Sequence, residues 1–549
     1  MLWPYVRPEL PRLGAALILG LMIAALGAAQ PLLTRVVIDD GLIGRHFDRL
    51  IYACLAMVAL ASMGMALGAL HRAIYVRASG RTLFALRRAA FAHLLRVSPR
   101  HLAELPVGDL VARLDGDVAE VQRFGTDSVA TFVSSILSLC LVSVVMVGIS
   151  WRLSLMIVAL APLQLVVRHI ARPRIESSTR AVRNEAGRVS SFLIEILTGA
   201  RAVQAAAAET HELCKLDALG EGYLGRVVNS QLVAYATGTA VALIGHLATA
   251  ATFVVGGWYV IHGELTVGAL VAFTAYLGRT AGSAASLAGL YTGYQRALVS
   301  LQRLQKLFEL PVVKESASAI GLPRDARGAL EFRAVTVRLA REGRCLLDNA
   351  TLSIPAGKKI VLRGASGVGK TTISDLLRRF VEPDSGRILL DGVPLDQIRL
   401  ADLRSRIVVV DHSPMLFRGT ILDNLRYGQP QVNEAAVLRA AVLAQVDEFV
   451  QDLADGYLTL VGEGGAGLST GQRQRIAIAR ASLTDPLVVI LDEATSGLDR
   501  ESSRSVHRAI DHAFGHRTRI IITHHAIDLE TADRCLLLEA GRLQDIVPG

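Results

Sequence analysis

Charged residues are scarce in this sequence. Asp, Glu, Lys and Arg make up 19% of the 549 residues and hydrophobic residues 52%, whereas a soluble globular domain carries about a quarter of charged residues. Three stretches, residues 13–34, 51–70 and 128–151, contain none of these four charged types. Each is long enough to cross a bilayer as a helix, which takes roughly 20 residues. The scarcity of charge therefore excludes a wholly soluble protein and indicates a membrane protein.

Cysteine is also rare. The chain has five cysteines with no C-x-x-C pair among them, and they are Cys54, Cys140, Cys214, Cys345 and Cys535. This spacing favours neither a disulfide framework nor a cysteine-based metal site. We expect unpaired thiols in a reducing compartment.

Three further apolar stretches complete the expected set of spans. They are residues 153–167, 227–263 and 265–295. Arg152 and Arg168 bracket the first of them, and their long side chains can reach the two membrane surfaces. His246 lies inside the second and Arg279 interrupts the third. The N-terminal apolar stretch has no small-residue cleavage site at signal-peptide length, so we expect it to stay as a helix. The sequence thus predicts six transmembrane helices.

Positive charge is distributed unevenly between the loops. The formal net charge is +9, but Lys and Arg lie largely between apolar runs rather than in one basic stripe, which favours lipid head groups over nucleic acid as the partner. Two precede the first span, nine lie in residues 72–127 and nine in residues 168–226, against three, one and none in the alternate loops. The positive-inside rule therefore predicts cytoplasmic termini and cytoplasmic long loops. Both long loops have helical periodicity, so spans two to five should continue as helices into the cytoplasm.

The apolar character ends near residue 310. We expect a transmembrane domain over residues 1–310, a linker over 311–328 and a soluble domain over 329–549. In the last, short apolar runs alternate with helical patterns, and these runs are residues 359–363, 407–410, 487–491 and 519–523. That alternation is typical of a mostly parallel α/β sheet.

A phosphate-binding loop follows the first of these runs. Gly364-Ala-Ser-Gly-Val-Gly-Lys-Thr371 fits the pattern G-x-x-x-x-G-K-S/T between an apolar strand and a helical segment. Glycines let backbone N–H groups turn toward phosphates, Lys370 can bridge the β- and γ-phosphates, and the Thr371 hydroxyl can ligate Mg²⁺. The loop predicts a nucleoside triphosphate site.

Two carboxylates end the apolar run 487–491. Asp492 and Glu493 should emerge at the carboxyl edge of the sheet, where ligands bind in open α/β folds. We expect Asp492 to hold Mg²⁺ and Glu493 to orient and polarise the attacking water. The sequence thus predicts hydrolysis as well as binding.

Between these elements stands Leu468-Ser-Thr-Gly-Gln-Arg-Gln-Arg475, and here the chain resembles the ABC transporter superfamily. The segment is close to the family's signature, with Thr470 where glycine is usual. Ser496-Gly-Leu-Asp499 and Thr523-His524 follow in the family's order, and the resemblance extends to Gly263–Leu270 in the membrane domain. The resemblance implies an exporter-type half-transporter with an α-helical six-span transmembrane domain, followed by an α/β P-loop ATPase domain with a helical subdomain.

The resemblance also implies the site residues and the cofactors, ATP and Mg²⁺. Glu493, His524 and His412 take the catalytic positions, and Thr371 and Asp492 the metal positions. The nucleotide-binding positions are Gly364, Ala365, Ser366, Gly367, Val368, Gly369, Lys370, Thr371, Thr372, Leu339, Ser469, Gly471 and Gln472. In the family, the signature of one subunit covers the nucleotide on the other subunit's phosphate loop. A dimer with a second half-transporter subunit is therefore expected, with contacts to the membrane loops at 114–117 and 209–212.

Two positions depart from the family pattern. His412 stands where a glutamine is expected, and imidazole suits Mg²⁺ poorly, so it is either a functional substitute or a tolerated loop residue. Leu339 replaces the aromatic residue that usually stacks on adenine. These departures leave a heterodimer with one weakened site as the alternative to the favoured homodimer.

The expected function is ATP-driven export or flipping of an amphipathic small molecule, lipid or peptide across the plasma (inner) membrane, with the nucleotide-binding domain and both termini in the cytoplasm. An importer built on the exporter fold is the alternative. Arg279 in the last span should face a cavity and suit an acidic or amphipathic cargo, unless it makes a structural pair. The identity of the substrate does not follow from the sequence.

Overall fold

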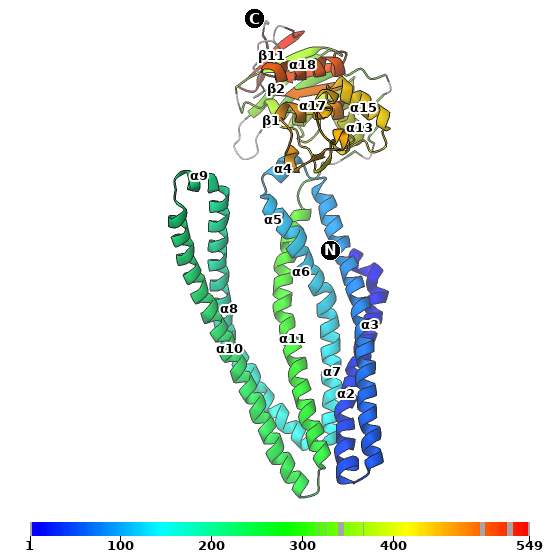
Figure 1. Cartoon of the computed structure of the whole chain (residues 1–549), viewed down its shortest axis with the longest axis vertical. Helices are drawn as coiled ribbons and strands as arrows, with labels where there is room; N and C mark the ends of the chain where they lie inside the picture. Colours follow the sequence, from blue (N-terminus) through cyan, green and yellow to red (C-terminus); the bar gives the residue numbers. More distant parts are fainter. Residues whose placement is uncertain are drawn as a thin grey trace. The chain divides into compact units, whose positions relative to one another are not determined.

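The computed structural model describes residues 3–313, 315–316, 318–323, 325–338, 345–365, 367–494, 500–523 and 531–546. The chain forms two compact units, one of Met1–Phe91 with Val107–Phe308 and the other of Ala92–Pro106 with Glu309–Gly549 (Figure 1). The short segment 92–106, which the sequence analysis assigned to the transmembrane domain, thus belongs with the C-terminal unit. All five cysteines are unpaired, as predicted.

The first unit is entirely helical. Its long helices are α2 (Leu10–Val36), α3 (Phe47–Leu94), α7 (Val129–Ile149), α8 (Trp151–Thr198), α10 (Glu209–Ile261) and α11 (Val267–Phe308). Shorter elements are α1 (Trp3–Val6), η1 (Arg7–Glu9), η2 (Val37–Ile43), α5 (Val107–Ala112), η3 (Arg113–Asp117), α6 (Val118–Arg123), η4 (Phe124–Ser128) and α9 (Ala200–Ala205). α10 has 53 residues, about 80 Å at 1.5 Å per residue, against a hydrocarbon core of about 30 Å. The predicted helical extensions beyond the membrane are therefore present.

Five helical segments of the described chain are long and apolar enough to cross a membrane. They are Trp3–Ile43, Phe47–Leu94, Val107–Ile149, Trp151–Thr198 and Glu209–Ile261. The sixth predicted span corresponds to α11, which runs alongside α2 and α7 (Figure 1). Its apolar character is weaker because Arg279 and several small polar residues interrupt it. Tyr276 of α11 is fully buried and donates a hydrogen bond to the Ala28 carbonyl of α2, so this helix is an integral part of the bundle.

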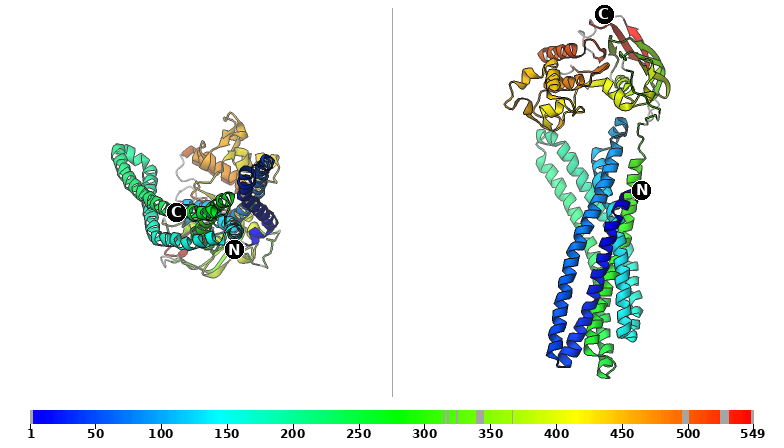
Figure 2. Two further views of the ribbon diagram at one scale, coloured as in Figure 1. Left: turned by 90° about the horizontal axis from the view of Figure 1, so that it is seen from below. Right: turned by 90° about the vertical axis from the view of Figure 1, so that its right-hand side faces the viewer.

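α8 and α10 form a pair within this unit. They contact each other along much of their length and are joined by α9, and toward the α9 end they stand apart from α11 and α7 (Figures 1 and 2). α8 begins directly after α7, because Ser150 adopts an extended conformation and its side chain accepts a hydrogen bond from the Leu153 amide. The tight turn predicted at Ser150 is confirmed.

The second unit is built on a six-stranded sheet with the order β12-β11-β3-β10-β9-β6. These strands are β3 (Lys359–Arg363), β6 (Ile407–Asp411), β9 (Val488–Asp492), β10 (Thr518–Ile522), β11 (Arg534–Glu539) and β12 (Arg542–Ile546). β12 alone is antiparallel to its neighbour. The four apolar runs of the sequence analysis are β3, β6, β9 and β10, four of the five parallel strands, which confirms the α/β prediction.

A second, antiparallel sheet has the order β2-β1-β4-β5. Its strands are β1 (Leu330–Arg338), β2 (Cys345–Ile354), β4 (Ser385–Leu390) and β5 (Val393–Pro394), and a third, two-stranded sheet pairs β7 (Gly419–Thr420) with β8 (Leu460–Val461). The helices are α4 (Pro99–Ala103), α12 (Lys370–Leu377), α13 (Leu400–Arg406), α14 (Ile421–Leu425), α15 (Glu434–Leu443), α16 (Asp447–Val450), α17 (Thr470–Ser482) and α18 (Arg500–Phe514). One hydrophobic core joins the antiparallel sheet to β3 and α12, and another joins β9 to α15, α17 and α18. Both cores meet at β3 and β9, the two strands that carry the site.

Candidate functional site

The loop between β3 and α12 has the geometry of a phosphate cradle. Gly369 precedes α12 with a φ of 114°, in the left-handed region that glycine adopts at little cost. At Gly364 a Cβ atom would lie only 2.7 Å from the carbonyl oxygen of Leu538. Glycine at both ends therefore allows a tight turn. The backbone amides at the start of α12 can then donate hydrogen bonds to an anion.

Lys370 closes this loop. Its side chain is buried, and Nζ donates to the carbonyl oxygens of Gly364 at 2.7 Å and Ala365 at 3.2 Å. These bonds hold the ammonium group above the loop backbone, where phosphate oxygens would be its natural acceptors. Gly367, Val368 and Thr372 complete the described part of the loop and of the first helical turn, and Ser366 lies outside the described residues.

Thr371 and Asp492 come together across the site. The Thr371 hydroxyl at the start of α12 donates to a carboxylate oxygen of Asp492 at the end of β9 over 3.2 Å. A hydroxyl and a carboxylate are the hard oxygen donors that Mg²⁺ prefers. In the part of the chain that the structure describes, no cluster of three His, Cys, Asp or Glu side chains could hold a metal by itself. The two residues thus fit a Mg²⁺ ion that completes its coordination with phosphate oxygens and water.

Asp411 is an additional carboxylate at this edge of the sheet, and the sequence analysis missed it. It ends β6 in register with Asp492 on the neighbouring parallel strand, so the two side chains leave the sheet on the same face. Burial raises the pKa of Asp492, as do the nearby Asp411 and Glu493 carboxylates, while the Thr371 hydroxyl and His412 oppose the rise. Asp411 stands at the end of an apolar run, as Asp492 does, and this position was the signal in the sequence for a second carboxylate at the site.

Glu493 has an unusual backbone conformation. It follows β9 with a φ of 51°, a left-handed value that costs a side-chain-bearing residue roughly 1–3 kcal/mol, and its amide donates to the Ile522 carbonyl at 2.9 Å. The half-buried side chain thereby leaves the line of the strand immediately after Asp492. A carboxylate next to Asp492 and Thr371 is in a suitable place to orient water.

His412 is exposed, directly after β6 and Asp411. Its carbonyl accepts a hydrogen bond from Nε2 of Gln474, a fully buried residue of α17, at 3.2 Å. The expected glutamine position is therefore joined through its backbone to the signature helix. Leu339 and His524, two further sequence-predicted site residues, lie outside the described residues, as do residues 496–499.

The signature segment forms the start of α17. Ser469 is the N-cap: its hydroxyl accepts from the Gln472 amide, and the Gln472 side chain accepts in return from the Ser469 amide at 2.8 Å. Arg473 adds a bond to the Thr470 hydroxyl, the departure from the usual glycine, at 3.0 Å. Gly471 is buried within the first turn. The capping box makes this helix start a rigid surface.

The signature and the phosphate loop of one chain are not joined. Among the described residues, no hydrogen bond or ion pair connects residues 469–472 with 364–372, although Ser469 is exposed. The structure therefore brings together Lys370, Thr371, Asp492 and Glu493, and leaves the signature residues outside this group.

The segment 92–106 contacts the far end of the phosphate-loop helix. Ser98, just before α4, donates to the carbonyl of Phe380, and the guanidinium groups of Arg378 and Arg404 lie 4.6 Å and 4.7 Å from the centre of the Phe380 ring. Arg378 is also ion-paired with Asp375 of α12 at 3.6 Å. Burial raises the pKa of Asp375, which Arg378 opposes and the nearby Asp411 and Asp492 reinforce. The nucleotide site and this segment thus share one helix.

The contact expected at residues 114–117 stays a prediction. Asp115 accepts a hydrogen bond from Arg87, and Asp117 is buried and accepts from the Ser300 hydroxyl at 2.7 Å, both within the membrane unit. Asp117 is thus satisfied inside the bundle, whereas Asp115 and Gly116 are exposed. Residues 209–212 begin α10, where Glu212 pairs with Lys215 at 2.8 Å.

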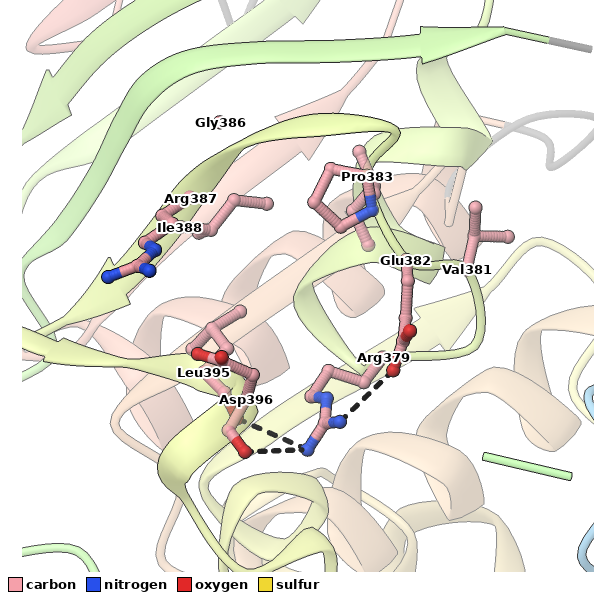
Figure 3. Close-up of a pocket in the computed structure, with 10 residues that line it drawn as sticks. Arg379, Val381, Glu382, Pro383, Gly386, Arg387, Ile388, Leu395 and Asp396 are labelled. Atoms are coloured by element: carbon pink, nitrogen blue, oxygen red, sulfur yellow. Dashed lines mark hydrogen bonds and ion pairs between the residues drawn. The ribbon is translucent and has the colours of Figure 1, made fainter. Parts of the chain in front are cut away.

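A cavity of about 210 Å³ lies near the C-terminal end of α12, at the opposite end from Lys370 (Figure 3). Arg379 lines it, and its guanidinium group donates to Glu382 at 3.1 Å and to the Leu395 carbonyl at 3.4 Å. Arg379 is buried and has a φ of 54°. The hydrogen bonds of the Arg379 side chain hold the residue in this left-handed conformation and so anchor the turn after α12.

Comparisons with known proteins agree with this arrangement. Residues 13–283 match the family model "ABC transporter transmembrane region" and residues 347–496 match "ABC transporter". An uncharacterised ABC transporter ATP-binding protein of Bacillus subtilis is 30% identical over 98% of this chain and 89% of its own length. The ATP-dependent lipid A-core flippase of Thiobacillus denitrificans is 31% identical over 98% and 93%. The alpha-hemolysin translocation ATP-binding protein of Escherichia coli is 31% identical over 95% and 73%.

A solved structure has the same fold. A bacterial Atm1-family ABC exporter with ATP bound superposes with a TM-score of 0.81 and 25% identity, covering 97% of this chain and 94% of the exporter. The resemblance noted in the sequence is confirmed by both kinds of comparison. This chain belongs to the ABC transporter family: it is a multi-pass membrane half-transporter of the exporter type, a class that dimerises, and its ATP-binding domain couples ATP hydrolysis to transport.

Proposed function

We propose that this half-transporter moves an amphipathic molecule, a lipid, a peptide or a small molecule, from the cytoplasmic side of the plasma (inner) membrane outward. Two relatives named above are a lipid A-core flippase and an alpha-hemolysin translocation protein. The observation that carries the proposal is the combination of a helical membrane bundle with the group Lys370, Thr371, Asp492 and Glu493 in one chain.

In this proposal each residue of that group has one role in hydrolysis. Lys370 and the loop amides bind the β- and γ-phosphates, and Thr371 and Asp492 hold Mg²⁺, which neutralises phosphate charge when it is bound. Glu493 accepts a proton from the attacking water and orients it toward the γ-phosphorus. Asp411, beside Asp492, adds negative charge that favours a cation at this edge.

The proposed working unit is a dimer with two composite sites. Ser469 and Gly471 of the partner subunit cover the γ-phosphate held by Lys370, because in one chain these residues are not joined to the phosphate loop. A homodimer is favoured, since Lys370, Asp492 and Glu493 are all present. A heterodimer remains the alternative because of His412 and Leu339.

The proposed orientation follows from the positive loops. The long helical extensions carry most of the Lys and Arg of the membrane domain, so they and the nucleotide-binding domain face the cytoplasm, as do both termini. Closure of the two nucleotide sites then draws these extensions together and opens the bundle outward.

The direction of transport is testable in inverted membrane vesicles, whose cytoplasmic face is outside. We expect ATP to drive accumulation of a fluorescent amphiphile inside vesicles carrying the wild-type protein, and no accumulation with Glu493→Gln. ATP-driven depletion from the vesicle interior would favour the importer instead. Hydrolysis without movement of any amphiphile would contradict the proposed function.

A further inference from the structure

A cavity of about 530 Å³ lies between α8, α10 and α11 of the membrane unit. Its lining residues are Gln164, Arg168 and Ile175 of α8, Ala234, Thr237, Gly238, Val241, Ala242 and Gly245 of α10, and Ala281 of α11. The residues of α8 fall on one helical face, and those of α10 follow the spacing of another. The wall on α10 is made largely of small residues, and a Cβ atom added at Gly238 or Gly245 would meet nothing within 4 Å. The space is thus real volume with an apolar wall.

Arg168 is the one charged residue among the described residues that line this cavity. The structure gives its half-buried side chain no ion pair and no hydrogen bond within the described chain. Arg172, one turn further along α8, is paired by contrast: it bonds Glu176 and the Tyr291 hydroxyl, each at 2.7 Å. An unpaired guanidinium group beside an apolar wall can bind an anion.

Arg279 is not the cavity arginine that the sequence analysis expected. Its guanidinium group donates to the Gly27 carbonyl of α2, and a Cβ atom at Gly27 would lie 2.2 Å from its terminal nitrogen. The alternative of a structural pair is therefore the observed one. The charge available to a cargo is that of Arg168.

The depth of the cavity suits one end of an amphiphile. Arg168 is about 25 Å along α8 from Trp151, at 1.5 Å per residue. The wall on α10 runs from Gly245, about 24 Å from Ile261, to Ala234, about 40 Å from it, at the same rise per residue. The hydrocarbon core is about 30 Å thick. With the proposed orientation, Arg168 lies near the cytoplasmic boundary of the core, level with the head groups of the inner leaflet.

We propose that this cavity binds an anionic amphiphile, with its head group on Arg168 and Gln164 and its alkyl chain against Ala242 and Gly245, the part of the α10 wall that lies within the thickness of the core. The inference rests on the proposed function and adds the charge and the location of the cargo. Gln164 is one helical turn before Arg168 on the same face and supplies an amide donor to the same head group. The volume is within the range of ligand-binding pockets, about 300–1,000 Å³.

Binding of radiolabelled dodecyl phosphate to the full-length protein in nanodiscs tests this inference. We expect Arg168→Gln to weaken binding at least tenfold and Arg168→Lys to weaken it less, because lysine keeps the charge without the planar fork. Zwitterionic dodecylphosphocholine should bind poorly to the wild type, and inorganic phosphate should not displace the probe. Equal displacement by inorganic phosphate would overturn the amphiphile assignment.

A second variant tests the cavity without altering its charge. Gly245→Leu fills the space from α10, whereas Gly257→Leu on the same helix enters open space and does not line the cavity. We expect Gly245→Leu to weaken dodecyl phosphate binding at least tenfold and Gly257→Leu to bind it like the wild type. If Arg168→Gln fails to assemble, the comparison of Gly245→Leu with Gly257→Leu tests the inference by itself. Wild-type binding by both Arg168→Gln and Gly245→Leu would overturn the inference.

The inference and the proposed function can fail separately. If the wild type moves a fluorescent anionic amphiphile in inverted vesicles and Arg168→Gln moves it equally well, the cavity assignment is wrong and the proposed function stands. If the wild type hydrolyses ATP but moves no amphiphile, the proposed function itself is wrong.

Discussion

At the scale of single residues, the nucleotide site depends on where two parallel strands end. β6 and β9 both finish with an aspartate, Asp411 and Asp492, and the next residue after β9 is the strained Glu493. Because side chains in register on parallel strands leave the sheet on the same face, Asp411 lies near Asp492, whose carboxylate accepts from the Thr371 hydroxyl. The strain at Glu493 stays in place because its amide is bonded to Ile522.

Replacing Glu493 tests its proposed role as the base. Glu493→Gln keeps the size of the side chain and removes the proton acceptor, so we expect turnover to fall by about 10²–10⁴-fold while ATP still binds. Steady-state hydrolysis and equilibrium ATP binding measure the two effects. Glu331→Gln, at an exposed ion pair with Arg333 on β1, is the matched control and should leave both unchanged. Undiminished hydrolysis by Glu493→Gln would remove this residue from the mechanism.

Gly27 and Arg279 provide a test inside the bundle. Gly27→Ala would push the Arg279 guanidinium away from its carbonyl acceptor, and a hydrogen bond to a charged group contributes roughly 1.5–3 kcal/mol. We therefore expect a lower midpoint of thermal unfolding in detergent. Gly64→Ala on α3, where a Cβ meets nothing within 4 Å, should be neutral or stabilising because alanine favours helix. Identical midpoints for the two variants would mean that the Arg279 contact contributes nothing.

At the residue scale, neighbours in the fold could be predicted from the sequence where a motif fixes the spacing. The sequence analysis singled out Thr371 and Asp492, which the structure brings within hydrogen-bonding distance. It missed Asp411, because one aspartate after an apolar run carries no motif of its own. It also expected Arg279 at a cavity, since sequence shows that a charge lies in a span but not which neighbouring helix supplies an acceptor.

At the scale of elements, the parallel strands were predictable and the antiparallel sheet was not. Strands buried on both faces read as continuous apolar runs, which is why β3, β6, β9 and β10 stood out. β1 and β2 alternate between buried and exposed residues and are paired with register shifts, so their pattern is weak. The contact of segment 92–106 with Phe380 was likewise not foreseen, because it joins residues almost 300 positions apart.

Asp533 anchors the start of the central strand β3. Its carboxylate accepts from the Lys359 amide at 2.8 Å and from Lys358 Nζ at 3.0 Å, and these bonds lower its pKa. A lowered pKa in the folded state means that the ionised group stabilises the fold above the ordinary aspartate pKa, and that this stabilisation is lost as the pH falls toward the lowered value. Acid should therefore weaken this anchor.

Asp533→Asn measures that contribution. We expect the midpoint of thermal unfolding to fall at neutral pH by a few degrees, corresponding to about 1 kcal/mol. The difference from the wild type should shrink as the pH is lowered below about 4, because the carboxylate of the unfolded chain then binds a proton, and it should vanish once the folded carboxylate is protonated as well. Asp452→Asn is the control, since Asp452 is exposed and has no side-chain bond among the described residues. A constant difference between Asp533→Asn and the wild type from pH 7 to pH 3 would contradict the account.

At the scale of the whole molecule, composition and motif spacing predicted the class of protein. Scarce charge and long apolar runs gave the membrane bundle, and the order of phosphate loop, signature and acidic strand gave the ATPase. The weaker apolar character of α11 shows why a hydropathy criterion finds five spans while six long helices are present. The surface that meets the partner subunit could not be derived from one chain. Within one chain, the start of the signature helix α17 is capped by its own residues Ser469 and Gln472 and lies apart from the phosphate loop.

The central claim is that each ATP site is shared between two subunits. It can be tested by mixing two inactive subunits, one with Lys370→Ala and the other with Ser469→Asp. Aspartate is also a good N-cap, so this substitution should keep the start of α17 while placing a negative charge against the γ-phosphate. In the mixed dimer, Lys370 of the second subunit and Ser469 of the first form one intact site, whereas each parent homodimer has none.

Vanadate trapping of nucleotide and ATP hydrolysis should both be measured on purified mixed dimers that carry two different affinity tags. We predict one trapped nucleotide per mixed dimer and hydrolysis above the level of either parent homodimer. If the mixed dimer traps no more nucleotide than the two parents, the site is contained within one chain and the account is wrong.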